Sequence, residues 1–281
     1  MCGIVGYIGY RDAQPVILKG LKRLEYRGYD SAGIALLNGD ITMEKVAGKV
    51  QALEEAIRDH PQEAKVGIGH TRWATHGEPT RNNAHPHISE NGKISLIHNG
   101  IIENHKSLKE ELMNRGHTFR SETDTEVLVH LIEDIQEKEE KPLEEAVRIA
   151  LAKVVGAYAI VVMGQDDPRT LIAARKGSPL VVGIGNEEYF LASDATPIVE
   201  YTRNVIYLKD NDVAVVRGDS MVLKTIENEV QTPYVQELEF SLEQIEKGGY
   251  DHFMLKEIHE QANSLSDTMR GRLNVNEGTL T

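Results

Sequence analysis

The sequence predicts an α+β fold in which helices cover two sheets. Strand and helix signals come in blocks, whereas a doubly wound parallel sheet requires strict alternation. Many short strand signals accompany a few long helical ones. Of the 281 residues, 40% are hydrophobic. This is enough for one large domain, or for one domain with a modest appendage.

The N-terminal part predicts a strand, a helix and a hairpin. Residues 2–9 form a short apolar run that is rich in β-branched side chains and closed by a glycine, which is typical of a buried strand. A helix is expected over 12–27, because Pro15 suits a first helical turn and a glycine follows the apolar periodicity. The Asn38-Gly39 pair then supplies the positive φ angles of a tight turn. We therefore expect hairpin strands over 31–37 and 41–46.

The middle of the chain is mainly helical. Apolar spacing predicts a short helix over 50–57 and a strand over 66–71. Residues 73–87 show neither period and are predicted to form a long loop, and long loops in compact domains are often functional. We expect a strand over 94–98 and helices over 107–115, where Ser107 and Glu110 form a capping pair, over 125–139 and over 142–155.

The pattern changes again after residue 156. We expect strands over 157–163, 170–175, 180–184, 189–192, 205–208, 213–217 and 221–225. Strand signals stop at about Tyr234. Beyond it, four apolar residues at helical spacing predict a linker helix that docks on another surface; they are Met254, Ile258, Leu265 and Met269. We therefore divide the chain into a domain over 2–233 and a linker over 234–281.

Charge and apolar patterning exclude several classes of partner. The formal net charge is −13, and no basic run is present to neutralise a phosphate backbone, so we expect no nucleic acid partner. No apolar stretch approaches the ~20 residues that span a bilayer, and the N-terminus lacks a basic region followed by an apolar one. We expect a cytoplasmic protein that does not bind membranes. Its single cysteine allows no intrachain disulfide.

That cysteine directly follows the initiator methionine. Removal of the methionine, which a small second residue generally permits, would leave Cys2 with both a thiol and a free α-amine. An amine with a pKa of ~7.7–8.0 is partly unprotonated at neutral pH, so it can serve as general base for the nucleophilic thiol. The alternative is a small buried hydrophobic residue at a strand start. Position two favours the nucleophile, because the apolar strand fixes a terminus that would otherwise fray.

The segment from His70 to Gly77 carries a guanidinium, two histidines and hydroxyl groups into the predicted loop. An arginine fork can bind a carboxylate through two hydrogen bonds, so Arg72 is a candidate for carboxylate capture. A solvated surface arginine is an equal alternative. Five histidines invite a metal interpretation, but their spacing matches no common zinc pattern, and we expect no metal and no cofactor. They are His70, His76, His85, His87 and His98.

Two further segments have both a structural and a chemical interpretation. Asn99-Gly100 between apolar runs is typical of a hairpin turn, but the Asn99 amide and the Gly100 N–H could also form an oxyanion hole. Asp124 lies where a helix begins, which suits a cap or the positive end of the helix dipole. It could also bind a substrate ammonium group. For Asp30 and Gly33, the end of a helix and the start of a strand are sufficient explanation.

Six segments are collinear with the motifs of one known family. They are CGIVG (2–6), LEYRGYDSAG (24–33), GHTRWATHG (69–77), NAHPH (83–87), HNGIIEN (98–104) and SETDTE (121–126). Together they resemble the class II glutamine amidotransferases, whose fold is that of the N-terminal-nucleophile hydrolases. The resemblance covers essentially the whole chain. It implies a four-layer αββα sandwich with a C-terminal linker helix.

The resemblance also implies an activity, the hydrolysis of L-glutamine to glutamate and ammonia through a γ-glutamyl thioester. In the implied site Cys2 is the nucleophile with its own α-amine as base, and Asn99 and Gly100 form the oxyanion hole. The implied binding residues are Arg72, Thr75 and His76 for the α-carboxylate, Asp124 for the α-ammonium, Trp73 at the entrance to an ammonia passage, and Arg27 as support for the nucleophile.

The implied partner is a sugar-isomerase module that binds fructose 6-phosphate, to which the linker leads. Nothing in the 281 residues resembles that module, so the chain is expected to be the amidotransferase half with its linker, with homodimer formation as one option. Ala262 stands where the linker of the family is expected to carry a proline. Within the family, residues 26–30 and 73–76 favour the aminosugar branch over purine or asparagine biosynthesis. A non-catalytic glutamine-sensing or assembly module is the alternative from another class.

Overall fold

The structure is a computed structural model that describes residues 2–58, 62–74, 77–238, 250–269, 273–274 and 279–280. The chain divides into two compact units, Met1–Leu238 and Glu239–Thr281, which we describe separately. Within the described residues, no helix is both long enough and apolar enough to cross a membrane.

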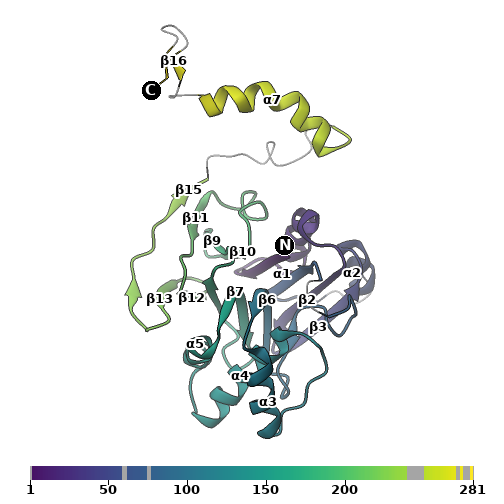
Figure 1. The fold of residues 1–281 in the computed structure, drawn as a ribbon, viewed down its shortest axis with the longest axis vertical. Coiled ribbons are helices and arrows are strands. Elements are labelled where there is room, and N and C mark those ends of the chain that lie inside the picture. Colours follow the sequence, from purple (N-terminus) through teal and green to yellow (C-terminus); the bar gives the residue numbers. More distant parts are fainter. Residues whose placement is uncertain are drawn as a thin grey trace. The chain divides into compact units, whose positions relative to one another are not determined.

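The first unit contains two antiparallel sheets (Figure 1). The eight-stranded sheet has the order β15-β11-β9-β10-β1-β4-β2-β3. Its strands are β1 Gly3–Ile8, β2 Ser31–Asn38, β3 Asp40–Ala47, β4 Val66–Arg72, β9 Val181–Ile184, β10 Tyr189–Ala192, β11 Asn204–Tyr207 and β15 Gln236–Glu237. Because β1 pairs with β10 on one side and β4 on the other, the start of the chain is held inside the sheet.

The seven-stranded sheet has the order β14-β13-β12-β8-β7-β6-β5. Its strands are β5 His87–Ile88, β6 Ile94–Ile102, β7 Gly156–Gly164, β8 Thr170–Lys176, β12 Asp212–Arg217, β13 Met221–Thr225 and β14 Val230–Gln231. The longest pairing joins β6 to β7 over nine residues. This pairing determines where the end of β6 lies.

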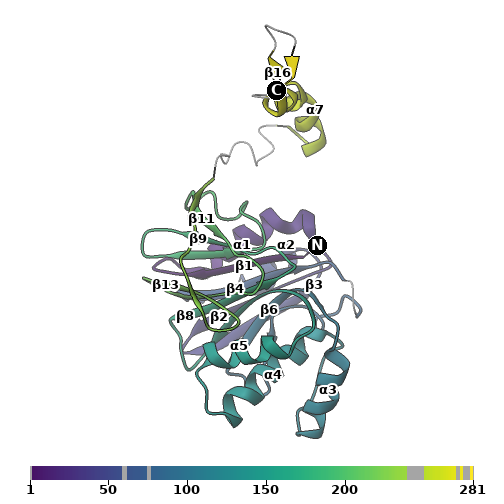
Figure 2. The same cartoon turned by 60° about the vertical axis from the view of Figure 1, so that its left-hand side comes forward.

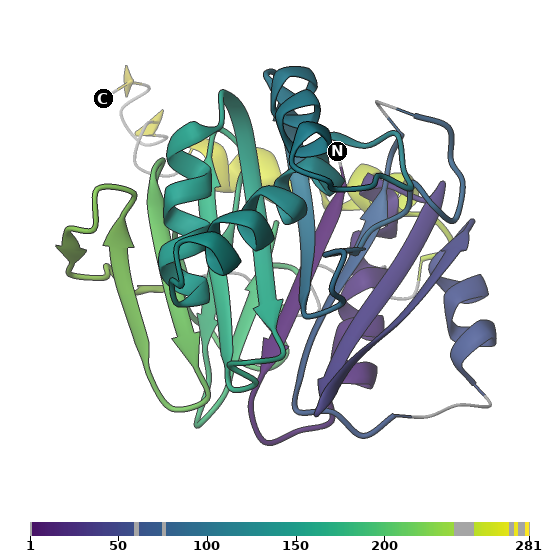
Figure 3. The same ribbon diagram turned by 90° about the horizontal axis from the view of Figure 1, so that it is seen from below.

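Helices cover the outer face of each sheet. One face carries α1 Ala13–Leu24, which continues into the short 3₁₀ helix η1 Glu25–Arg27, and α2 Val50–Ile57; the other carries α3 His105–Asn114, α4 Asp124–Lys138 and α5 Leu143–Lys153. Figure 2 shows the resulting order of layers, helix, sheet, sheet and helix, and Figure 3 shows the second group of helices lying over the seven-stranded sheet. The expected four-layer αββα sandwich is therefore the observed fold.

Alternating side chains of β7 build two separate cores. Ala159, Val161 and Met163 pack between the two sheets. Tyr158 and Ile160 point the other way, into the core beneath the second group of helices. Burying an apolar side chain of this size contributes roughly 1.5–3 kcal/mol. β7 is therefore buried on both faces: one face packs against the other sheet and the opposite face packs against the second group of helices.

Close packing of α1 on the eight-stranded sheet depends on glycines in β4. A Cβ atom on Gly69 would lie 2.4 Å from Cγ2 of Ile17 and 3.0 Å from Cδ1 of Leu21. The helix is held at its start by Asp12, whose carboxylate accepts a hydrogen bond from the Gln14 N–H. The apolar face of α1 therefore lies directly over the backbone of β4.

Most predicted elements are confirmed, but several local details differ from the prediction. β6 continues four residues beyond the predicted strand. The capping pair of Ser107 and Glu110 is wrong, because α3 begins at His105 and the Ser107 hydroxyl donates to the Asn104 carbonyl. In the first hairpin only Gly39 has a positive φ. Finally, β15 pairs with β11 after Tyr234, so strands persist beyond the point where their signal ends in the sequence.

The second unit contains the helix α7 Phe253–Met269 and the paired strands β16 Leu273–Asn274 and β17 Thr279–Leu280. The helix agrees with the prediction for this segment. Its apolar residues at helical spacing are exposed, with Met254 at 72% and Ile258 at 60%.

Candidate active site

Cys2 lies immediately before β1, beside the end of β4. Gly3 pairs with Thr71 in the sheet, which brings the thiol to the backbone of Trp73. The Trp73 N–H donates to Sγ at 3.2 Å, and the thiol lies 3.6 Å from the Trp73 carbonyl oxygen. Burial raises the pKa of the Cys2 thiol, while the Trp73 N–H and the positive charge of the N-terminus act to lower it. The backbone of Trp73 thus interacts directly with the candidate nucleophile.

A cavity of about 40 Å³ opens beside this thiol. Such a volume holds a few water molecules. Five separate segments converge on it, namely the N-terminus, the end of β4, the loop before β5, the end of β6 and the start of α4. The lining residues are Cys2, Arg72, Trp73, His85, His98, Gly100, Thr123, Asp124 and Thr125.

Asn99 lies within β6, opposite Ala159 of β7. Its amide Nδ2 donates to the Cys2 carbonyl at 3.0 Å. Its Oδ1 lies 2.9 Å from Nε2 of His70, which is also 3.1 Å from the His98 carbonyl. Because a carbonyl only accepts, Nε2 of His70 carries the proton in this network. The two contacts together fix the orientation of the Asn99 amide, with its NH₂ group toward Cys2.

The backbone at Gly100 distinguishes between the two interpretations of Asn99-Gly100. The hairpin-turn interpretation is wrong, because β6 continues to Ile102 and Gly100 pairs with Tyr158. Its φ is 137°, and a Cβ atom would lie 2.1 Å from the Ala157 carbonyl oxygen. Only glycine fits here without displacing β7. The exposed residue borders the cavity beside the thiol.

Asp124 connects the start of α4 to the same strand. The cap of this helix is Thr123, whose hydroxyl accepts from the Glu126 N–H, so a capping role for Asp124 is wrong. Its Oδ2 instead accepts a hydrogen bond from the Ile102 N–H at 2.8 Å. A carboxylate in the first turn also interacts favourably with the helix dipole. Asp124 therefore places a negative charge at the cavity, close to the end of β6.

The remaining predicted residues differ in how closely they approach the cavity. The buried Arg72 lines it and donates to the carbonyls of Gly77 and Glu78, both at 3.2 Å. The Trp73 ring is 47% exposed and meets Tyr29 edge-on at 5.4 Å. Arg27 forms an ion pair with Asp194 at 3.1 Å and is not one of the cavity-lining residues. Thr75 and His76 lie outside the described residues.

A buried hydroxyl connects two histidines that the sequence analysis considered only as metal ligands. The Thr125 Oγ1 lies 2.8 Å from Nε2 of His85 and 3.0 Å from Nδ1 of His98. Burial lowers the pKa of His85 and of His98, and it lowers the pKa of the neighbouring His70 to about 3. They are therefore neutral at physiological pH and act through hydrogen bonds. In the sequence, only the presence of these histidines within the collinear segments could have indicated that they belong to the site.

Asp30 and Gly33 hold the loops around the thiol, which the sequence analysis did not predict. The Asp30 carboxylate accepts a hydrogen bond from the Ala74 N–H, and the backbone N–H of Asp30 donates to the Arg72 carbonyl at 3.1 Å. A Cβ atom on Gly33 would lie 2.2 Å from the His85 carbonyl oxygen. Both residues therefore do more than begin a strand.

Comparison with known proteins identifies the family of the chain. The family described as a glutamine amidotransferase domain matches residues 57–236. The glutamine–fructose-6-phosphate aminotransferase (isomerizing) of Chlorobaculum tepidum is 58% identical over 282 residues, which cover 99% of this chain and 46% of the relative. The enzyme of the same name from Bacteroides thetaiotaomicron is 56% identical over 278 residues, 98% of this chain and 45% of that one.

Solved structures show the same fold. Glutamine phosphoribosylpyrophosphate amidotransferase from B. subtilis, complexed with ADP and GMP, gives a TM-score of 0.68 at 28% identity, over 82% of this chain and 50% of that one. The allosteric regulatory enzyme of purine biosynthesis gives 0.70 at 29% identity, over 80% and 49%. The chain spans about half the length of the curated relatives that it matches. It belongs to the class II glutamine amidotransferases and has the fold of the N-terminal-nucleophile hydrolases.

Proposed function

We propose that this chain hydrolyses L-glutamine to glutamate and ammonia, with Cys2 as the nucleophile. The observation that carries the proposal is the convergence of a thiol, a guanidinium and a carboxylate on one cavity that Gly100 also lines, with the neighbouring Asn99 amide hydrogen-bonded to the Cys2 carbonyl. An amino acid amide presents complementary groups, namely an electrophilic carbon, a carboxylate and an ammonium. Arg72 would bind the carboxylate and Asp124 the ammonium.

In the first step, Sγ of Cys2 attacks the γ-carboxamide carbon and the carbonyl oxygen becomes negative. The Asn99 amide and the Gly100 N–H donate to that oxygen, which lowers the barrier most where charge develops. The α-amine of Cys2, once Met1 is removed, takes the thiol proton and passes a proton to the leaving ammonia. Water then attacks the γ-glutamyl thioester, releases glutamate and returns the thiol.

For the whole protein we propose the ammonia-supplying half of glucosamine 6-phosphate synthesis from fructose 6-phosphate. The two relatives described above are glutamine–fructose-6-phosphate aminotransferases, which supports this branch. The partner would be a sugar-isomerase module that receives the ammonia, and the residues that follow β15 would form the linker toward it. The first compact unit ends at Leu238, so the linker would begin just after β15.

The direct test compares the 281-residue chain with its Cys2→Ala variant. We expect the wild type to release equal amounts of glutamate and ammonia from glutamine. Cys2→Ala should release neither, because it removes the nucleophile and little buried volume. The far-ultraviolet circular dichroism spectrum should be unchanged, which excludes misfolding. Glutamine binding without hydrolysis by the wild type would instead indicate a sensing module and contradict the proposal.

A further inference from the structure

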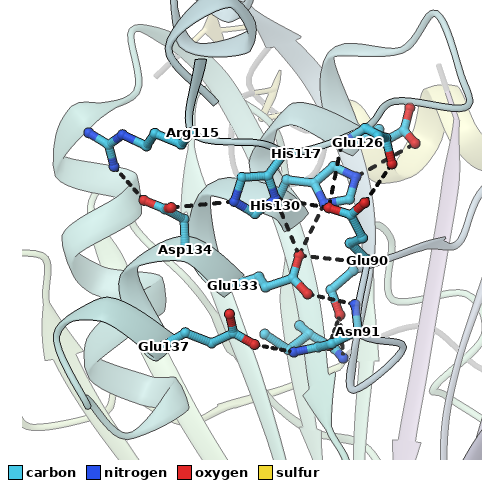
Figure 4. Close-up of polar contacts among 12 residues, drawn as sticks. Glu90, Asn91, Arg115, His117, Glu126, His130, Glu133, Asp134 and Glu137 are labelled. Atoms are coloured by element: carbon cyan, nitrogen blue, oxygen red, sulfur yellow. Dashed lines mark hydrogen bonds and ion pairs between the residues drawn. The ribbon is translucent and has the colours of Figure 1, made fainter. Parts of the chain in front are cut away.

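A second cluster of ionisable side chains lies between the turn that precedes β6, the segment joining α3 to α4, and α4 itself (Figure 4). Glu90, His117 and His130 each direct one potential ligand atom toward the others, and all three atoms lie within 4.8 Å of one another. Nδ1 of His117 is 3.5 Å from Oε2 of Glu90. None of these residues lines the cavity beside Cys2.

The outer nitrogen of each imidazole faces a buried carboxylate. Nε2 of His117 lies 3.3 Å from Oδ1 of Asp134, and Nδ1 of His130 lies 3.1 Å from Oε2 of Glu133. A carboxylate accepts the N–H, so the protons belong on these outer nitrogens. The inner nitrogens then present lone pairs. This carboxylate–histidine pairing is the usual outer shell of a metal site, because it fixes the tautomer and raises the basicity of the ligand.

Among the described residues the inner nitrogens form no hydrogen bond, although carboxylate oxygens of Glu90, Glu133 and Glu126 lie 3.5 to 3.7 Å from them. Nδ1 of His117 and Nε2 of His130 are both buried without a hydrogen bond, and the His130 side chain is only 3% exposed. A buried polar atom without a hydrogen bond destabilises the folded state. The arrangement therefore calls for a further ligand at this point, or for a proton shared with the neighbouring carboxylates.

The surrounding charge favours a cation. Glu133 accepts from the N–H groups of Glu90 and Asn91, at 3.0 and 2.7 Å, and Oε1 of Glu126 lies 3.7 Å from Nε2 of His130. The cations Arg115 and Lys138 both pair with Asp134, on the far side of His117, while Lys45 and Arg120 line the cavity beside the cluster. The carboxylates of Glu90, Glu133 and Glu126 nevertheless approach the two inner nitrogens to 3.5 to 3.7 Å, which favours a cation at that point.

We propose that Glu90, His117 and His130 bind one divalent transition-metal ion, such as Zn²⁺. Two imidazoles and one carboxylate suit zinc and its neighbours, whereas Mg²⁺ and Ca²⁺ prefer oxygen ligands alone. A tetrahedral zinc ion would draw the three atoms together by roughly 1.5 Å at most, since its bonds are about 2.0–2.2 Å. Glu90 is exposed at the protein surface, and its carboxylate would have to loosen its hydrogen bonds from Thr118 to make this adjustment.

A cavity of about 170 Å³ borders Glu90 and His130 and leaves room for a water molecule as fourth ligand. The bound ion would connect the turn before β6, the α3–α4 segment and α4. His130 and Asp124 lie on the same helix. The ion would thus brace the helix that carries Asp124 to the active-site cavity, without contacting that cavity.

The competing state is a proton on His130. Glu126 and Glu133 outweigh the effect of burial and raise the pKa of His130 to about 9. A metal ion must therefore displace that proton. If protonated His130 is more stable than the metal-bound form, the cluster is an ion-pair network around an imidazolium and binds no metal.

Calorimetric titration of the metal-free 281-residue chain with Zn²⁺ tests the proposal. All proteins should carry Cys2→Ala, so that the thiol cannot bind the ion. We expect one site per chain. Glu90→Gln removes a direct ligand and should weaken Zn²⁺ binding by at least about 10–100-fold, because the loss of an outer-shell partner alone has an effect of that size. His117→Gln should abolish Zn²⁺ binding. The visible spectrum of added Co²⁺ should change in the same variants.

Glu137→Gln is the matched control. Glu137 also carries an exposed carboxylate and bonds to Asn91 in the same turn, at 2.8 Å, but it is not a member of the three-residue cluster. The Glu137→Gln variant should bind Zn²⁺ with the same affinity as the parent chain. Absence of binding to the parent, or equal affinities for Glu90→Gln and Glu137→Gln, would overturn the proposal. Glu90→Gln decides the question even if His117→Gln fails to fold. The test measures no glutamine turnover, so it is independent of the proposed function.

Discussion

At the scale of single residues, Asn99 has the most specific role in the proposed reaction. Its amide is oriented by contacts on both sides, to Cys2 and to His70. In Asn99→Ala we expect turnover of glutamine to fall by roughly 10²–10³-fold, because one donor to the developing oxyanion is lost. The Michaelis constant should change little. Steady-state measurement of ammonia release separates the two parameters; an effect on the Michaelis constant alone would exclude the oxyanion role.

Arg72 should show the opposite behaviour. Its guanidinium lines the cavity and also holds the carbonyls of Gly77 and Glu78. Arg72→Lys replaces a two-pronged donor by a point charge, so we expect weaker glutamine binding and a smaller effect on turnover. The same kinetic assay checks this, with an unchanged Michaelis constant as the contradictory outcome.

At the scale of elements, β4, β6 and the loop before β5 each place a neutral histidine in one buried region. Burial lowers the pKa values of His70, His85 and His98 in the folded protein, while in the unfolded chain they should titrate near ~6.5. Below that pH the unfolded state binds more protons, so stability should fall as the pH decreases. Each histidine contributes up to roughly 1.4 kcal/mol per pH unit. For His70 this window extends down to about pH 3.

Urea unfolding at a series of pH values measures this loss. The control is His252→Gln, which removes an exposed histidine of the second unit and should leave the pH dependence unchanged. His98→Asn should reduce the slope by about one proton in the acid range. A stability that stays constant between about pH 7 and about pH 5 would contradict the assignment of neutral buried histidines.

The elements that could be predicted from the sequence are those whose periodicity is local. The residues within each element are sufficient to predict α1, α4, α5 and most strands. The end of β6 could not be predicted in this way, because pairing with the distant β7 extends the strand through Asn99-Gly100. Likewise, the importance of Gly33 depends on the His85 carbonyl that packs against it. Contacts between remote segments decide both cases.

At the scale of the whole molecule, both described cores belong entirely to the first unit. We therefore expect a chain that ends after Leu238 to fold with a thermal midpoint close to that of the 281-residue chain. It should also release ammonia from glutamine at a comparable rate, since no cavity-lining residue lies beyond that point. Calorimetry and the ammonia assay check the two expectations. Loss of cooperative unfolding would show that the second unit stabilises the first.

The order of layers followed from the resemblance to a family, while periodicity alone led only to two sheets covered by helices. The collinear segments also identified most residues around the cavity. The cluster of Glu90, His117 and His130 had no such signal, because three separate segments contribute one ligand atom each and no short motif joins them. Sites assembled by tertiary contact in this way become visible only in the folded chain.

Covalent labelling of Cys2 tests the central claim most directly. The 281-residue chain is incubated with a thiol-directed glutamine analogue, and the modified peptide is identified by mass spectrometry. We predict one adduct per chain, on an N-terminal peptide that begins at Cys2, with ammonia release lost in proportion and labelling prevented by excess glutamine. An adduct elsewhere, or full ammonia release from chains alkylated at Cys2, would contradict the account.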